Sequence, residues 1–174
     1  MPATAIGNRK MDKGISIIEI LLVIIILGIS LLALLGVGAY SLQVSSSLKK
    51  IETAKNLAQE AVEAVRSFRS GTTWTTDGLG VIKIGDDNPY YPKLDSGVNP
   101  PKWTLLAGTQ TINGFIRKII FNNVSRDPTT NNIESVYNPS HNDPDTKMAQ
   151  VTVSWGSGAK NKVETIIYLT NWKQ

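Results

Sequence analysis

The sequence predicts an α+β protein in which a long amino-terminal helix packs on a carboxyl-terminal antiparallel sheet. Two observations lead to this fold class. Apolar residues recur at intervals of three and four between Ile51 and Phe68, which is the pattern of one face of an amphipathic helix. After Gly71 the chain changes to short segments of β-forming residues separated by turn residues. A helix with one apolar face stabilises itself by burying that face on such a sheet.

An apolar run from Ile15 to Leu35 precedes the amphipathic segment and contains a single charged residue, Glu19. Crossing ~30 Å of hydrocarbon at 1.5 Å per residue takes about 20 helical residues, so the run is long enough to span a membrane. A cleaved secretory signal has an apolar centre of only about 7 to 15 residues, which disfavours that alternative. Basic residues precede the run, so the positive-inside tendency holds residues 1–14 in the cytoplasm.

The residues at the start of this run resemble a known family. The stretch from Lys13 to Gly28 is KGISIIEILLVIIILG. It resembles the amino-terminal signature of type IV prepilins and of the pseudopilins of type II secretion systems, and the match covers about residues 8–40. In that family a membrane peptidase cuts after the glycine and methylates the new amino terminus. The resemblance therefore implies cleavage between Gly14 and Ile15 and methylation of Ile15.

The resemblance also implies a role for Glu19, which would become the fifth residue of the mature chain. The family assigns this position to a carboxylate that meets the positively charged amino terminus of a neighbouring subunit during filament assembly. A charge in the bilayer core costs roughly 2.5 to 3.5 kcal/mol on insertion scales. Two opposite charges attract strongly in a low dielectric, so pairing offsets the burial of both.

Three features depart from the family pattern. Ile15 replaces the commonest first residue, phenylalanine, and Gly36 stands where major pilins usually carry a helix-bending proline. Glycine weakens a helix by about 1 kcal/mol against alanine without removing a hydrogen bond, so Gly36 and Gly38 predict a soft point rather than a kink. The chain has no cysteine, whereas many Gram-negative pilins carry a disulfide. All three favour a minor pilin or pseudopilin over a typical major pilin.

The chain organisation follows from these segments. We expect a nearly continuous helix from Ile15 to Arg69, in which Arg66 and Arg69 suit the negative end of the helix dipole. The apolar stripe of its second half indicates packing on the outer domain in preference to a filament contact. The predicted parts are a cytoplasmic leader, a membrane or filament-core helix, its amphipathic continuation and an extracytoplasmic β-rich domain, at residues 1–14, 15–40, 41–70 and 71–174.

Alternation and β-forming residues predict six strands in the outer domain. Two of them flank Gly156 and form an antiparallel hairpin. The segments Asp86 to Lys102 and Arg126 to Lys147 are rich in Pro, Asn and Asp and are expected to be exposed loops. The predicted strands are Leu79–Ile84, Trp103–Leu106, Thr111–Phe121, Ile133–Tyr137, Met148–Trp155 and Val163–Leu169.

The charged and polar residues of the outer domain indicate no enzyme, metal or cofactor. His141 is the one histidine, and a lone loop histidine is expected to be solvated. Asp143 and Asp145 lack the glycine and distal glutamate of a known calcium loop. Asp86 and Asp87 are expected to form a turn. Removal of the leader leaves 15 basic and 13 acidic residues from the 18 and 14 of the chain, so charge gives little support to nucleic-acid binding.

Tryptophan and tyrosine are frequent in the outer domain and suggest two alternatives. An exposed aromatic platform would suit sugar or single-stranded DNA. Packing in the core or at a sheet edge is the favoured interpretation. The residues are Trp74, Trp103, Trp155, Trp172, Tyr90, Tyr91, Tyr137 and Tyr168.

The main functional hypothesis is a structural subunit of a type IV pilus or a type II secretion-like filament. Such a subunit is inserted in the bacterial inner or cytoplasmic membrane with its amino terminus in the cytoplasm, and then enters an extracellular or periplasmic filament. The resemblance implies as partners other pilin subunits, the prepilin peptidase and methylase, a platform membrane protein and, indirectly, an assembly ATPase. The alternative hypothesis is a permanently anchored extracytoplasmic module that binds carbohydrate or DNA.

Overall fold

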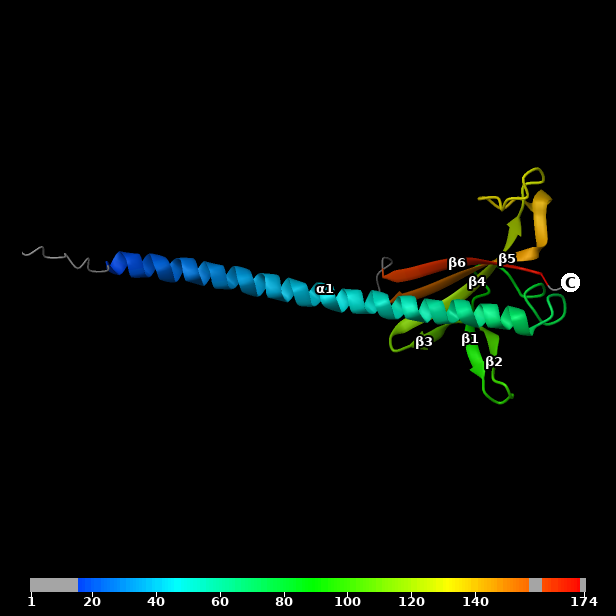
Figure 1. The fold of residues 1–174 in the computed structure, drawn as a ribbon, viewed down its shortest axis with the longest axis horizontal. Helices are drawn as coiled ribbons and strands as arrows, with labels where there is room; N and C mark the ends of the chain where they lie inside the picture. Colours follow the sequence, from blue (N-terminus) through cyan, green and yellow to red (C-terminus); the bar gives the residue numbers. More distant parts are fainter. Residues whose placement is uncertain (1–15, 157–160, 173–174) are drawn as a thin grey trace, which may run out of the picture. The chain divides into compact units, whose positions relative to one another are not determined.

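A computed structural model describes residues 16–156 and 161–172 (Figure 1). The predicted α+β class is confirmed, because one long helix and an antiparallel sheet make up these residues. In chain order the elements are α1 (Ile17–Gly71), β1 (Tyr90–Asp95), β2 (Lys102–Ala107), β3 (Gln110–Ile112), β4 (Phe115–Ser125), the 3₁₀ turn η1 (Pro139–His141), β5 (Asn142–Trp155) and β6 (Lys162–Thr170).

Helix α1 is 55 residues long and continuous because no proline interrupts it. It ends at Gly71, two residues beyond the predicted end at Arg69, and the Thr72 hydroxyl donates to the Phe68 carbonyl in its last turn. The chain divides into two compact units, of which the first ends at Ser47 and the second begins at Leu48. The apolar half of α1 belongs to the first unit. The amphipathic half and all strands belong to the second.

The sheet has the order β2-β1-β4-β5-β6, and β3 pairs with the start of β4. All pairs are antiparallel. The predicted terminal hairpin is confirmed as β5 and β6, which run side by side from Thr146 opposite Thr170 to Ser154 opposite Lys162. A bulge at Asn123 and Val124 shifts the register of β4 against β5. Such a bulge bends the strand and turns its end away from regular pairing.

The second half of α1 covers one face of this sheet (Figure 1). The predicted stripe is buried, and its contact residues are mostly alanines, which allow the helix backbone to approach the strands closely. Strand residues alternate between the two faces, so every second residue of β4 and β5 meets the helix. The buried residues of this core include Ala54, Ala58, Ala61, Val62, Val65, Ile119, Phe121, Ala149, Val151 and Val153.

The predicted strand Leu79–Ile84 is wrong, because this segment forms turns. Leu79 is fully buried, and the Gly80 amide donates to the Trp74 carbonyl at 2.9 Å. A side chain at position 80 would come within 2.6 Å of that carbonyl oxygen. The Gly80 backbone thus lies close to Trp74 and is not paired in the sheet. A sequence pattern does not reveal such a contact.

Two further strand predictions need correction. The predicted strand Thr111–Phe121 is two strands, β3 and β4, joined by a tight turn at Asn113 and Gly114, whose φ angles are 48° and 83°. An Asn-Gly pair is a strong signal for such a hairpin, and the prediction overlooked it. The predicted strand Ile133–Tyr137 is a loop in which only Ile133 forms an isolated bridge, to Arg126.

Both predicted loops contain strand residues. β1 lies within the predicted loop Asp86 to Lys102 and contains Pro92, a residue that is uncommon inside a strand. Beyond Tyr90, β1 pairs only with β2, so its other edge is free and the missing N–H of Pro92 breaks no ladder on that side. The predicted loop Arg126 to Lys147 ends early, because β5 already begins at Asn142.

Candidate functional site

The apolar half of α1 presents its side chains to the outside. Within the described residues α1 is long and apolar enough to cross a membrane, with a mean hydropathy of 3.2 over an 18-residue window of which none is buried. Large apolar side chains from Ile17 to Leu42 are roughly half or more exposed. Monomeric soluble proteins rarely expose so large a contiguous apolar surface. This finding is compatible with single-pass membrane anchoring.

Glu19 is the one acidic residue in the first turn of α1. Its side chain is exposed, and among the described residues its carboxylate has no hydrogen bond or ion pair. The predicted cleavage and methylation residues Gly14 and Ile15 lie outside the described residues. The structure thus shows a carboxylate in an apolar helix for which the described part of the chain supplies no partner.

Gly36 and Gly38 lie inside the continuous helix. A Cβ atom built at either position would meet nothing within 4 Å, and the same holds for Gly28. No contact within the described chain therefore requires these glycines. Their predicted role as a soft point of the helix stays a prediction.

A buried arginine joins the second half of α1 to the sheet. Arg117 on β4 is 1% exposed, and its Nη1 donates to the Leu57 carbonyl of α1 at 3.0 Å. Its Nη2 donates to Gln110 on β3 at 2.7 Å, and Glu60 of α1 lies 3.3 Å from Nη1. The sequence analysis missed this contact, since an arginine between apolar residues of a strand resembles a solvent-facing position.

Arg69 lies in the last turn of α1, as predicted, and is also buried. It is 3% exposed, and its Nε donates to the Thr170 carbonyl of β6 at 3.0 Å. Its guanidinium lies 5.3 Å from the ring centre of Trp74 and 5.5 Å from that of Trp172. Cation–π attraction between the guanidinium and each of these rings offsets part of the cost of burying the charge. Arg66, by contrast, remains exposed and pairs with Glu63.

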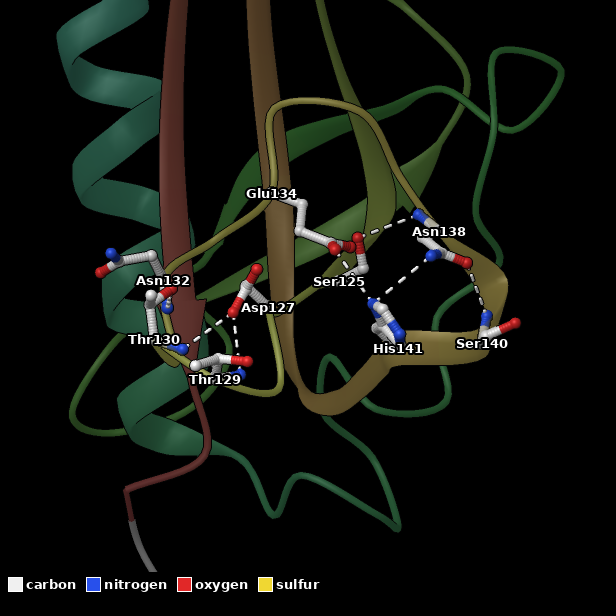
Figure 2. A network of polar contacts seen from close by, with 9 residues as sticks. All are labelled: Ser125, Asp127, Thr129, Thr130, Asn132, Glu134, Asn138, Ser140 and His141. Atoms are coloured by element: carbon white, nitrogen blue, oxygen red, sulfur yellow. Dashed lines mark hydrogen bonds and ion pairs between the residues drawn. The ribbon is translucent and has the colours of Figure 1, made fainter.

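The loop between β4 and η1 is held by polar contacts (Figure 2). His141 is half-buried and its Nδ1 lies 3.0 Å from Oε1 of Glu134, so the expectation of a solvated histidine is wrong. The Ser125 hydroxyl accepts from the Asn138 amide at 2.9 Å. Hydrogen bonding from the Ser125 side chain, followed by that from His141, holds the pKa of Glu134 below its ordinary value.

The start of the same loop is fixed by two aspartates. Asp127 accepts from the Thr129 and Thr130 amides, both at 2.8 Å, and these backbone bonds, that from Thr130 first, lower the pKa of its carboxyl (Figure 2). Arg126 donates to the Asp143 carboxylate at 2.6 Å. Burial raises the pKa of Asp143, but hydrogen bonds from Thr146 and Arg126 outweigh it and the net shift is downward.

The candidate calcium ligands are engaged in these contacts. Asp143 is paired with Arg126, and Asp145 accepts from the Asn171 side chain at 3.0 Å. Within residues 16–156 and 161–172, no group of three or more His, Cys, Asp or Glu side chains is placed to hold a metal ion.

The aromatic residues serve mainly in packing. The Trp74 ring is buried and its Nε1 donates to the Pro144 carbonyl, while Trp155 contacts Phe115. Three of these aromatic residues are more than 40% exposed. Trp172 contacts Arg69, whereas Tyr137 and Tyr168 line a cavity of about 330 Å³. The sequence analysis did not bring these two tyrosines together.

Comparison of the chain with protein-family models, with curated proteins and with solved structures finds no match. The candidate site therefore consists of residues that the chain itself presents. These are the exposed apolar half of α1 with Glu19, and the outer domain with its ordered loop.

Proposed function

We propose that this protein is a structural subunit, of the minor pilin or pseudopilin type, of a type IV pilus or type II secretion-like filament. The observation that carries the proposal is a carboxylate, Glu19, without a partner among the described residues, in the first turn of a helix whose apolar side chains are exposed. Assembly of several such helices would cover that surface and supply a partner for the charge.

The exposed apolar half of α1 supports both stages of this function. Before assembly, a bilayer covers about 20 apolar helical residues. After assembly, the same side chains are covered by the corresponding helices of neighbouring subunits. The covering material changes, while the helix keeps all its backbone hydrogen bonds internal, as every helix in an apolar medium must.

The Glu19 carboxylate makes assembly selective for correctly processed chains. Cleavage after Gly14 would create a positively charged amino group four residues before Glu19 in the sequence. A neighbouring subunit, offset along the filament, brings its own amino group to the Glu19 carboxylate. An unprocessed chain would lack this amino group and would leave the charge unpaired. The prepilin peptidase, the platform membrane protein and, indirectly, an assembly ATPase are the partners that this function requires.

Mass spectrometry of the native amino terminus tests the proposal against a permanently anchored binding module. A chain that begins with methylated Ile15 is the expected result. A chain that still begins with Met1 would contradict the filament proposal and would favour the anchored module.

Replacing Glu19 by alanine tests the charge pair. The neighbour's amino group would then be buried without a partner, at roughly 3 kcal/mol, which corresponds to about a hundredfold loss of incorporation. The measurement is the amount of subunit in filaments sheared from cells, relative to the amount in membranes. Glu52→Ala is the matched control, because Glu52 is an exposed carboxylate on the same helix outside the apolar run. Equal incorporation of the two variants would remove the charge pair from the proposal.

A further inference from the structure

A cavity of about 330 Å³ opens on the face of the sheet that α1 does not cover. Its floor comes from Asn122, Met148 and Tyr168, which lie directly opposite one another on β4, β5 and β6. Their neighbours Phe121 and Ala149 are buried in the core against α1. Because side chains alternate along a strand, the three floor residues point to the other face.

One wall of the cavity belongs to the ordered loop after β4. Ile133, Glu134 and Tyr137 line it. The Glu134 amide donates to the Ser125 carbonyl at 3.0 Å, and the Tyr137 hydroxyl donates to Asn142 at 3.1 Å. The wall is therefore held in place by bonds to both flanking strands before any ligand arrives. A preformed cavity of this size is typical of small-molecule sites.

The lining residues define the chemistry of a ligand. Glu134 is the one lining residue that is charged at neutral pH, and Lys147, which is not a lining residue, donates to the lining residue Asn123. The Glu134 carboxyl is held by the Ser125 side chain and by His141, which contacts Oε1, while Oε2 is buried and is paired by no other described residue. Glu134 lines the cavity with a carboxylate, which at neutral pH is an acceptor and therefore suits a ligand that donates hydrogen bonds.

The remaining lining is aromatic and amide in character. Tyr168 is 49% exposed, so one part of its ring is available to a ligand, and Asn122 and Asn123 add amide groups beside it. Tyrosine offers an apolar ring with a polar end. Together these groups suit a ring that has one apolar face and hydroxyl groups at its edge.

We propose that this cavity binds one neutral, hydroxyl-rich ring, a sugar unit of hexose size, with Tyr168 against its apolar face and the Glu134 carboxylate accepting a hydroxyl hydrogen. This site goes beyond filament assembly, because it would give the outer domain a ligand of its own. It depends on residues of the second compact unit and on none of the residues at the amino terminus.

Saturation-transfer NMR on the full chain tests the site, in a zwitterionic detergent that carries no sugar. The probes are methyl α- and β-glycosides of glucose, galactose and mannose. At least one is expected to receive saturation at millimolar concentration. Tyr168→Ala and Glu134→Gln should each weaken binding about tenfold, in line with the ~1 to 3 kcal/mol of an aromatic stacking contact or a buried acceptor.

Ile166→Ala is the matched control, because Ile166 is exposed on the same face of β6 and does not line the cavity. It should bind like the natural chain. The proposal is overturned if no glycoside receives saturation at about ten times the working concentration, or if Tyr168→Ala binds as well as Ile166→Ala. Displacement of a bound glycoside by tetramethylammonium through Glu134 would likewise overturn it in favour of a cation site.

A second experiment distinguishes binding of a free monosaccharide from binding of the terminal sugar of a polysaccharide. Oligosaccharides that end in the bound sugar are compared with its methyl glycoside. Equal affinity supports recognition of the terminal unit of a surface polysaccharide, and loss of binding to the oligosaccharides supports a free monosaccharide. Either result leaves the amino terminus untested, so failure here is distinguishable from failure of the filament proposal.

Discussion

The two halves of α1 share one backbone conformation and differ in what surrounds their side chains. From Leu48 onward, alanines and valines of the helix are buried against the sheet. Before Ser47, the large apolar side chains have no such cover within the described chain. The two halves of the helix are therefore stabilised in different ways. Its second half is stabilised by this chain's own core, and its first half depends on a medium or on neighbours.

Arg117→Ala should lower the free energy of unfolding of the second compact unit more than the other changes below. It removes three hydrogen-bonding nitrogens and leaves the Leu57 carbonyl and Gln110 without their buried donor, at a cost of about 3 kcal/mol. Chemical unfolding of the full chain in micelles, followed by circular dichroism of the sheet, measures this. Arg66→Ala is the control, because the exposed pair with Glu63 contributes only about 0.5 kcal/mol. Equal stability of the two variants would show that Arg117 does not join helix and sheet.

Gly80→Ala should cause the next largest loss of stability. The added methyl group would lie 2.6 Å from the Trp74 carbonyl oxygen, and backbone atoms must move to relieve the contact. Overpacking of this kind costs about 1 to 3 kcal/mol. Gly71→Ala provides the comparison, since nothing lies within 4 Å of its added Cβ. A melting temperature that is unchanged in Gly80→Ala would contradict the close approach of Gly80 to the Trp74 carbonyl.

Gly36→Ala tests the apolar half of α1. Alanine stabilises a helix interior by about 1 kcal/mol relative to glycine, and no neighbour in the described chain opposes the added methyl group. Hydrogen exchange of amides 33–41 should slow by about fivefold in micelles, while the unfolding of the outer domain stays as it was. A change in outer-domain stability would mean that the two halves are coupled.

Acid should loosen the ordered loop before the rest of the outer domain. The pKa of Glu134 is depressed in the folded state below its ordinary value of 4.5, so its contribution is present above that value and is lost as the pH falls through the folded pKa. Asp127 and Asp143 shift in the same direction. Exchange protection of amides 126–141 should therefore fall first as the pH decreases below about 4.5. Glu134→Gln should show a smaller decrease, and equal behaviour would assign the effect to the aspartates.

Periodicity was sufficient to predict the parts of the fold that depend on regular burial. The stripe from Ala54 to Val65 and the alternation along β5 and β6 each repeat with the geometry of a helix or a strand. The predicted end of the helix at Arg69 lies within two residues of the observed end at Gly71.

Features created by tertiary contacts could not be found in this way. Leu79–Ile84 is rich in β-forming residues, yet it forms turns and bends in which Gly80 lies against Trp74. The content of Pro, Asn and Asp suggested a loop at Asp86 to Lys102, but β1 has one free edge and tolerates Pro92. The Glu134–His141 pair and the cavity beside it join residues from a loop and three strands, so no short pattern contains them.

The contact between Arg117 and the Leu57 carbonyl has a mechanical consequence. It joins β4 to the backbone of α1. A pull along α1 acts on this bond and on the packed alanines at the same time, because all of them resist sliding of the helix over the strands. Tension is thus shared across the whole contact rather than concentrated on one bond after another. A domain attached in this manner would stay folded while its helix is drawn lengthwise.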